Sequence, residues 1–394
     1  MSLWQALIRQ SLKEGLPARN NMEILIAVLC FLVIYLGQTV IYRKYWDQGL
    51  SLDLDFDDRY LEIGDKSGIT ETITNRKMLP LTTLHVKFST ARSLQFQENE
   101  NAVVTDFYHR NDPFSIMGNR KVVRKLSFTA KERGLFFISA VKLMAKDFLM
   151  SKTFALSVEN QAYLYVFPEK LSNIQLDTVL DGMLGDLTSR RSLFPDPFAF
   201  SGLRTYSVGD PRKSINWKAT ARCDDLMVNV YEHTAEQRVK ILVCLEPNTM
   251  IRIHYIQEMC ISIASTAASY FLDNRIPVMI RANGYDLLSG EMEWVDFGSS
   301  GEHRFTVDKY LARITENAGI DRFVEVLKQE VTDVDSNTTY LIVSAYHKKD
   351  LLNELDHMAE KGKNIYMIVP YLNIQGCDDI RPYLHGMEVE LNDT

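Results

Sequence analysis

The sequence predicts a multidomain membrane protein of mixed α/β and all-β class: an N-terminal transmembrane helix, a small antiparallel β-sandwich and a C-terminal doubly wound α/β sheet. Three patterns support this prediction: a charge-free run near the N-terminus, a middle segment with a period of two, and a final segment in which apolar runs alternate with helical patterns. At 394 residues the chain is long enough for two or three domains. Its 46% apolar and 24% charged residues are typical of globular rather than disordered protein.

The first predicted elements are an amphipathic segment over residues 1–21 and a membrane anchor over residues 22–44. Ile24–Tyr42 has 19 residues without a charge, and a helix of that length spans about 28 Å, close to the hydrocarbon thickness of a bilayer. A buried core helix and a cleaved signal peptide are the alternatives. Core helices usually keep a polar stripe, however, and the apolar core of a signal peptide is shorter. We therefore expect a retained single-pass anchor, whose orientation the flanking basic residues leave open.

Residues 50–167 are predicted to form the β-sandwich. Short runs in this segment alternate apolar and polar residues, and Gly-Asp and Asn-Arg pairs separate the first of them. Sandwiches of this kind are usually spacers or binding modules, so no function follows from this domain alone. We interpret residues 168–235 as a connecting region.

Residues 236–394 are predicted to form the α/β domain. Arg238–Pro247 is an apolar run suited to a strand that is buried on both faces. Helical patterns over Ile253–Leu272 and Lys349–Lys361 alternate with further apolar runs, which indicates βαβ crossovers and a mostly parallel sheet. Ligands of such sheets bind beyond the carboxyl ends of the strands.

Two of these strand ends correspond to a metal site of the von Willebrand A type. That site needs Asp-x-Ser-x-Ser after one strand and a carboxylate after the other, because Mg²⁺ prefers hard oxygen ligands. Here the positions hold Glu246, Asn248 and Met250, and then Ser344 and Ala345. A thioether does not bind a hard cation, so we predict a degenerate site with no metal and no cofactor, although Glu246 and Asn248 keep oxygen atoms.

A basic stretch precedes the α/β domain. Although the chain has a formal net charge of -7, Leu203–Arg222 contains five basic residues and one acid, Asp210. Its sequence, RTYSVGDPRKSINWKATAR, resembles the signature of the domain-of-unknown-function family numbered fifty-eight, the MoxR-associated proteins with a von Willebrand A-like domain. The matching positions are Arg204, Tyr206, Gly209, Asp210, Arg212 or Lys213, Ile215, Asn216, Trp217, Lys218, Ala221 and Arg222.

A second family element, Arg-Gly-x-(Tyr/Phe) followed by an Asp-Pro-Phe-like motif, is matched by ERGLFF and, without its proline, by KDFLM. The resemblance implies a C-terminal von Willebrand A-like domain and a non-enzymatic role beside a MoxR-type AAA+ ATPase. It therefore implies cytoplasmic C-terminal domains, because a cytosolic ATPase must reach them.

The signature itself has two interpretations. It could be a basic docking surface whose guanidinium groups bind carboxylates or phosphates. Alternatively it is a framework in which Asp210 pairs with an arginine while Trp217 and Ile215 pack inward. We favour the framework, since basic runs with interleaved aromatic residues are usually structural or solvated.

No enzyme motif is present in the sequence. It lacks the P-loop, the dinucleotide-binding glycine pattern, the nucleophile elbow and the zinc-protease motif. The mild acidity and single small basic cluster argue against a nucleic-acid partner. We predict a non-enzymatic membrane-anchored adaptor that binds a protein, with an outward-facing metal-dependent adhesion protein as the alternative and an unrecognised hydrolase as a further one.

Overall fold

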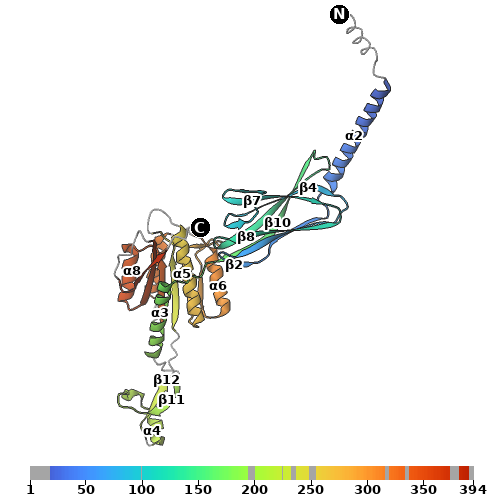
Figure 1. Cartoon of the computed structure of the whole chain (residues 1–394). Helices are drawn as coiled ribbons and strands as arrows, with labels where there is room; N and C mark the ends of the chain where they lie inside the picture. The colour runs from blue at the N-terminus through green and yellow to red at the C-terminus, as the bar shows by residue number, and fades with distance from the viewer. Residues whose placement is uncertain are drawn as a thin grey trace. The chain divides into compact units, whose positions relative to one another are not determined.

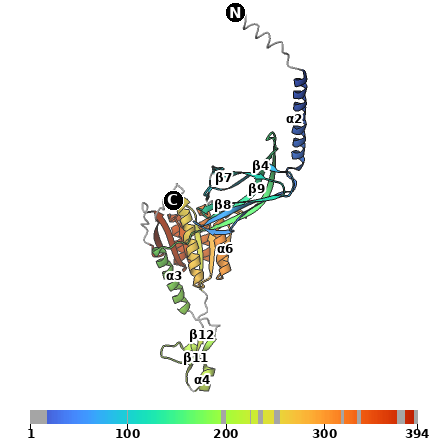
Figure 2. The same ribbon diagram turned by 45° about the vertical axis from the view of Figure 1, so that its right-hand side comes forward.

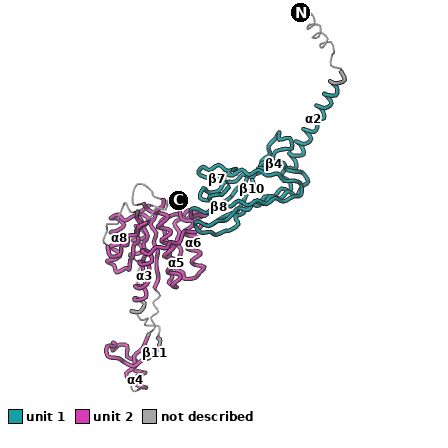
Figure 3. The backbone as a smooth tube through the Cα atoms, in the orientation of Figure 1, with its two compact units in different colours: residues 1–131, 136–164 teal, residues 132–135, 165–394 magenta. Residues whose placement is uncertain are grey.

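The computed structural model describes residues 18–98, 100–193, 200–223, 225–231, 237–247, 254–315, 319–332, 337–372 and 381–389. These residues form a mixed α/β structure with mostly β content, one N-terminal apolar helix and several sheets, which confirms the predicted class at this level (Figure 1, Figure 2). The chain divides into two compact units, residues 1–131 with 136–164, and residues 132–135 with 165–394 (Figure 3). The predicted segment 1–21 lies outside the described residues up to residue 17.

The N-terminal helix α2 runs from Ala18 to Tyr45. Over Met22–Tyr45 it is long and apolar enough to cross a membrane once. Its last turns bury one side against the first unit: Tyr42 is 3% exposed and donates a hydrogen bond to the Pro80 carbonyl at 2.8 Å. Just beyond the helix, the Trp46 ring stacks on Phe154 at 6.0 Å. The helix is therefore joined firmly to the strands that follow it.

Two sheets make up the first unit, with strand orders β1-β3-β8-β5 and β2-β10-β9-β4-β7-β6. Alternate side chains of the long strands β3 and β7 are buried, as expected for sheets that cover one another on one face. Arg124 of β8 reaches Asp112 of β7 at 3.3 Å and so links the two sheets. The strands are β1 (Leu50–Phe56), β2 (Tyr60–Glu62), β3 (Lys66–Asn75), β4 (Leu81–Ala91), β5 (Leu94–Phe96), β6 (Ala102–Val104), β7 (Phe107–Ile116), β8 (Arg120–Ala130), β9 (Gly134–Lys146) and β10 (Thr153–Phe167).

The second unit is built on a six-stranded sheet with the order β16-β14-β13-β18-β19-β20. Strands β14, β13, β18, β19 and β20 pair in parallel, and β16 pairs with β14 antiparallel. Strands β15 and β17 form a separate short antiparallel pair. The strands are β13 (Arg238–Cys244), β14 (Val278–Ala282), β15 (Tyr285–Asp286), β16 (Trp294–Gly298), β17 (Ile314–Thr315), β18 (Thr338–Ser344), β19 (Asn364–Leu372) and β20 (Leu384–Val389).

Helices cover both faces of this sheet. Val239, Ile241 and Val243 of β13 belong to the core cluster shared with α3, α5 and α6. Leu242 and Cys244, which alternate with them, belong to the cluster shared with α7 and α8. The helices are α3 (Ile174–Leu193), α5 (His254–Asp273), α6 (Gly301–Arg313), α7 (Ile320–Thr332) and α8 (Lys349–Glu360). Both faces of the strand are therefore buried, which accounts for its largely apolar sequence, and the buried Lys240 is paired with Glu330 at 2.6 Å.

Helix α3 lies in the range 168–235 that we interpreted as a connection. Leu176, Leu180, Met183 and Leu187 are buried in the core of the second unit. The spacing of four, three and four residues places them on one face of the helix. The second unit therefore takes structure from well before residue 236, and it begins at Tyr165 along that part of the chain.

Candidate partner-binding site

The signature forms a small module of its own between α3 and β13. Strands β11 (Phe200–Thr205) and β12 (Met227–Tyr231) pair antiparallel, so that Arg204 lies opposite Val228. The short 3-10 helix η1 (Arg212–Ser214) and the helix α4 (Trp217–Cys223) fill the connection between these strands. An isolated bridge between Ile215 and Val228 brings the connection back onto β12.

Asp210 holds the turn after β11. Its carboxylate accepts hydrogen bonds from both terminal nitrogens of Arg204, at 2.7 and 2.6 Å, and from the Ser207 N–H at 2.9 Å. The Arg204 guanidinium and the Ser207 N–H hold the pKa of Asp210 below its usual range. The preceding Gly209 has a φ of 119°, a conformation that strongly favours glycine. The expected pair of Asp210 with an arginine is present, but the Arg204 side chain is 49% exposed, so the pair is not buried.

Asn216 begins α4 and ties it to β12. Its side-chain oxygen accepts from the Ala219 N–H at 3.0 Å, in the manner of a helix N-cap, and its amide nitrogen donates to Asn229 at 2.8 Å. The Tyr206 hydroxyl donates to the Asp210 carbonyl at 3.3 Å. One group of signature positions therefore shapes the module through polar contacts.

The remaining signature side chains point to solvent. Trp217 is 67% exposed, so the prediction that it packs inward is wrong. Among the described residues of the module, Val228 is the single buried apolar side chain, and Ile215 is half-buried. The module therefore has no core in which an indole could be buried. Val208 is also fully exposed. Five further signature residues of the module are exposed as well, namely Arg212, Lys213, Lys218, Ala221 and Arg222.

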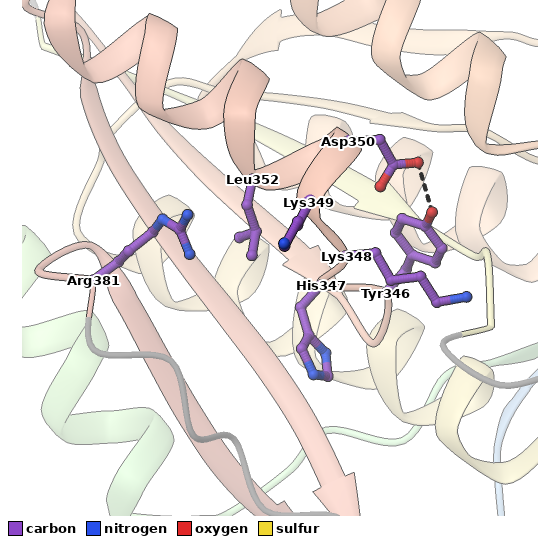
Figure 4. Close-up of a pocket in the computed structure, with 7 residues that line it drawn as sticks. All are labelled: Tyr346, His347, Lys348, Lys349, Asp350, Leu352 and Arg381. Carbon is purple, nitrogen blue, oxygen red and sulfur yellow. Dashed lines mark hydrogen bonds between the residues drawn. The ribbon is translucent and has the colours of Figure 1, made fainter.

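A second basic site lies in the second unit, where β18 ends and α8 begins. A cavity of about 770 Å³ is lined by Tyr346, His347, Lys348, Lys349, Asp350, Leu352 and Arg381 (Figure 4). Four of these seven residues are Lys, Arg or His, and the backbone N–H groups of the first turn of α8 add positive potential. The cavity therefore has the chemistry to accept a carboxylate or a phosphate.

Internal contacts hold several lining residues in place. The Tyr346 hydroxyl donates to Asp350 at 2.6 Å, and burial together with that carboxylate raises the pKa of Tyr346. The Lys348 ammonium lies 5.2 Å from the centre of the Tyr346 ring. Arg381 binds Asp356 through two nitrogens, at 3.0 and 3.1 Å. Although burial opposes ionisation of Asp356, hydrogen bonds from Arg381 and Tyr383 keep its pKa below its usual range.

Two of the predicted degenerate metal-site positions, Ser344 and Ala345, directly precede Tyr346 of this cavity. Ser344 and Ala345 are buried, and the Ser344 hydroxyl donates to the Tyr346 carbonyl at 2.8 Å instead of facing a ligand. Glu246 is half-buried, whereas Asn248 and Met250 lie outside the described residues. Within the described ranges, no group of three or more His, Cys, Asp and Glu side chains is arranged to hold a metal ion.

Sequence reasoning missed the basic cavity. The sequence pattern that could have indicated it is the run of three basic residues, His347–Lys349, between a buried strand and the start of a helix. Arg381 is distant in the sequence, so no local pattern connects it with this run. Arg133 of the ERGLFF element also has a structural role that its sequence did not indicate. Its guanidinium donates to the Leu311 and Ile314 carbonyls, at 2.9 and 3.0 Å, and to Glu258 at 2.8 Å.

Part of the chain matches the model of a known protein family. The model of the family "Protein of unknown function DUF58" matches residues 202–276, which include the signature module, β13 and α5. No curated protein is significantly similar to the chain.

Solved structures resemble the chain over about a third of its length. The CARDB domain of the PF1109 protein from Pyrococcus furiosus is 12% identical, over 30% of this chain and 91% of that one, with a TM-score of 0.20. A non-cellulosomal cohesin from Archaeoglobus fulgidus is 11% identical, over 33% of this chain and 97% of that one, with a TM-score of 0.20. TM-scores this low carry no functional argument.

Proposed function

We propose that the chain is a non-enzymatic, membrane-anchored adaptor that binds a protein partner through the signature module. The family whose model matches residues 202–276 is of unknown function, so the proposal is drawn from the chain's own site. The observation that carries the proposal is the exposure of Trp217 beside basic side chains on a module with almost no core. Tryptophan and arginine are the residues that most often dominate the energy of protein interfaces. An exposed indole offers a partner a large apolar face together with a hydrogen-bond donor, which is why tryptophan is enriched at interfaces.

The basic character of the module indicates the kind of partner surface. Arg212, Lys213, Lys218 and Arg222 are exposed in a protein whose net charge is -7. The cavity at His347–Lys349 is basic as well. Complementary charge steers association and excludes partners of the same sign. We therefore propose an acidic partner surface, and a MoxR-type AAA+ ATPase in a complex-assembly system as the partner.

The remaining parts support the same role. The sheet of the second unit, with helices on both faces, has the arrangement that a von Willebrand A-like domain would have. Such a domain serves here as a binding module. The helix over Met22–Tyr45 is proposed as a retained anchor rather than a signal sequence, because Tyr42 and Trp46 join it to the first unit.

The test measures binding of the full-length protein in detergent micelles to the purified MoxR-type ATPase of the same organism, with and without nucleotide. Trp217→Ala should weaken binding by about 30-fold, the effect of losing roughly 2 kcal/mol at a hot spot. Lys213→Glu should weaken it in a salt-dependent way. The matched controls are Trp294→Ala, at an indole that is 49% exposed on β16, and Lys142→Glu, at an exposed lysine on β9.

Equal affinity for the module variants and the wild type would exclude the module as the docking surface. An absence of binding in every nucleotide state would exclude the ATPase. Orientation is tested separately in intact cells with a membrane-impermeant maleimide, because Cys223 of α4 is exposed. Labelling of Cys223 only after lysis is expected for a cytoplasmic module, and labelling of intact cells would favour the outward-facing adhesion alternative.

A further inference from the structure

Three turns of the first unit meet beside the C-terminal end of α2. They are residues 76–80, 117–119 and 147–152, which we name the anchor-side rim. The Asn75 side chain donates to the Leu79 and Met117 carbonyls, at 2.9 and 3.2 Å, and the Asn119 N–H donates to the Lys77 carbonyl at 3.0 Å. These bonds hold the first two turns together as one surface.

The third turn lies against α2 itself. The Gln38 side chain donates to the Asp147 carboxylate at 2.9 Å, and the hairpin of β9 and β10 rises beside the lower part of α2 in both views (Figure 1, Figure 2). Gln38 precedes Arg43, the first charge after the apolar run, by five residues. At 1.5 Å per residue, Gln38 lies about 7–8 Å before Arg43 along the helix, so its bond holds Asp147 beside the apolar run. A bilayer that covers the apolar run must reach this turn.

The rim exposes large apolar side chains at its tips. Met78 is 86% exposed, Met117 66%, Phe148 62%, Leu149 38% and Met150 62%. Single exposed apolar residues are ordinary, but five on adjoining turns form a patch that needs a partner. The patch adjoins a helix that is exposed along its apolar length. Interfacial segments of membrane proteins bury such side chains about 5–10 Å into the headgroup and acyl boundary.

The polar groups of the rim fit the same environment. Burial opposes ionisation of Asp147, but hydrogen bonds from the Ser151 hydroxyl, Gln38 and the Lys152 and Ser151 N–H groups keep its pKa below its usual range. The carboxylate therefore stays ionised, and donors within the protein replace the water that would otherwise solvate it. The exposed charges around the rim are mostly basic, namely Arg43, Lys44, Arg76, Arg120 and Lys152, with Asp47 as an acid among them. Each basic residue near an anionic membrane contributes about 1 kcal/mol of attraction.

We infer that the anchor-side rim is seated in the membrane interface, with Phe148, Leu149 and Met150 at the acyl boundary and the basic residues on anionic headgroups. The first unit is then docked on the bilayer instead of hanging from a flexible tether. The inference rests on the anchoring in the proposed function and goes beyond it, because an anchor alone does not require a second membrane contact.

The experiment places an environment-sensitive fluorophore (NBD) on single cysteines of the full-length protein in vesicles of phosphatidylcholine with and without phosphatidylglycerol. Cys30, Cys223 and Cys377 are first replaced by serine. The rim sites are Phe148→Cys and Met117→Cys. Phe107→Cys is the matched control, because Phe107 is 57% exposed at the opposite end of β7, and Val33→Cys reports the helix.

Labels at positions 148 and 117 should show blue-shifted emission and quenching by lipids that carry a spin label on the acyl chain, more strongly with phosphatidylglycerol. The label at position 107 should remain in water. A buried label at position 33 with water-exposed labels at positions 148 and 117 would overturn the inference and leave the anchor standing. Water-exposed labels at all four positions would overturn the anchor as well.

Discussion

Replacing Glu71 by glutamine is expected to remove a loss of stability that the first unit undergoes as the pH rises. Glu71 lies in β3, is 0% exposed, and neither of its carboxylate oxygens has a hydrogen-bond partner among the described residues. Burial, and then the neighbouring Asp112 carboxylate, raise the pKa of Glu71 to about 8, although Arg124 and Arg110 act in the opposite direction. The arginines are already bound to Asp112, at 2.6 Å for Arg110 and 3.3 Å for Arg124. Glu71 is therefore protonated in the folded protein at neutral pH.

The raised pKa determines the sign of the pH effect. A group with a folded-state pKa above its unfolded value contributes its full stability below the unfolded pKa and loses it as the pH rises through the folded pKa. For Glu71 the window runs from an ordinary value of 4.5 to about 8. Each pH unit in this window lowers the free energy of unfolding by about 1.4 kcal/mol. The loss reaches about 3 kcal/mol at pH 7 and about 5 kcal/mol once Glu71 is fully ionised.

Hydrogen–deuterium exchange with mass spectrometry measures this effect in the full-length protein. Exchange of β3 and β8 peptides is compared between the wild type and Glu71→Gln at each pH, so that the intrinsic pH dependence of exchange cancels. The ratio of the two rates should change about 100-fold between pH 5 and pH 7, since tenfold corresponds to 1.4 kcal/mol. Peptides of α8 serve as an internal control, and Glu159→Gln, at an exposed position of β10, serves as the matched variant. A constant ratio from pH 5 to pH 8 would show that Glu71 ionises near its ordinary pKa and would refute the reasoning.

Two further outcomes are expected. Mg²⁺ or Mn²⁺ should leave the melting temperature unchanged, because Ser344 is turned inward and a methionine, Met250, occupies a predicted ligand position. A bound metal at a concentration of roughly 100 times its dissociation constant would stabilise the protein by about 2.7 kcal/mol. An upward shift of the melting temperature that Glu246→Ala abolishes would therefore establish a metal site. Arg133→Ala should lower the free energy of unfolding of the second unit by about 2–3 kcal/mol, because it removes the charged hydrogen bonds of a side chain that is 5% exposed. The control is Arg120→Ala, at an exposed arginine. Equal melting temperatures for the two variants would contradict the structural role of Arg133.

The parts predicted from the sequence are those that local patterns encode. The charge-free run Ile24–Tyr42 predicted one N-terminal helix of membrane-spanning length, because span length and absence of charge are properties of neighbouring residues. Alternation over Lys66–Asn75 and the continuous run at Arg238–Cys244 separated half-buried from fully buried strands, since burial on one or both faces sets the period. The signature pattern led to the family that the model of residues 202–276 supports.

The tertiary structure alone decided which distant residues meet and which aromatic side chains find a core. Glu71 and Asp112 are buried near one another on different sheets, and no local pattern relates them. As a large aromatic residue, Trp217 was expected to be buried. It is exposed because its module, built on two short strands, encloses little volume. The turn at Asp147 was read only as a degraded motif, whereas its bond to Gln38 across more than a hundred residues holds it beside the anchor. Sequence periodicity specifies the face on which a side chain lies, and the packing of distant elements determines what that face meets.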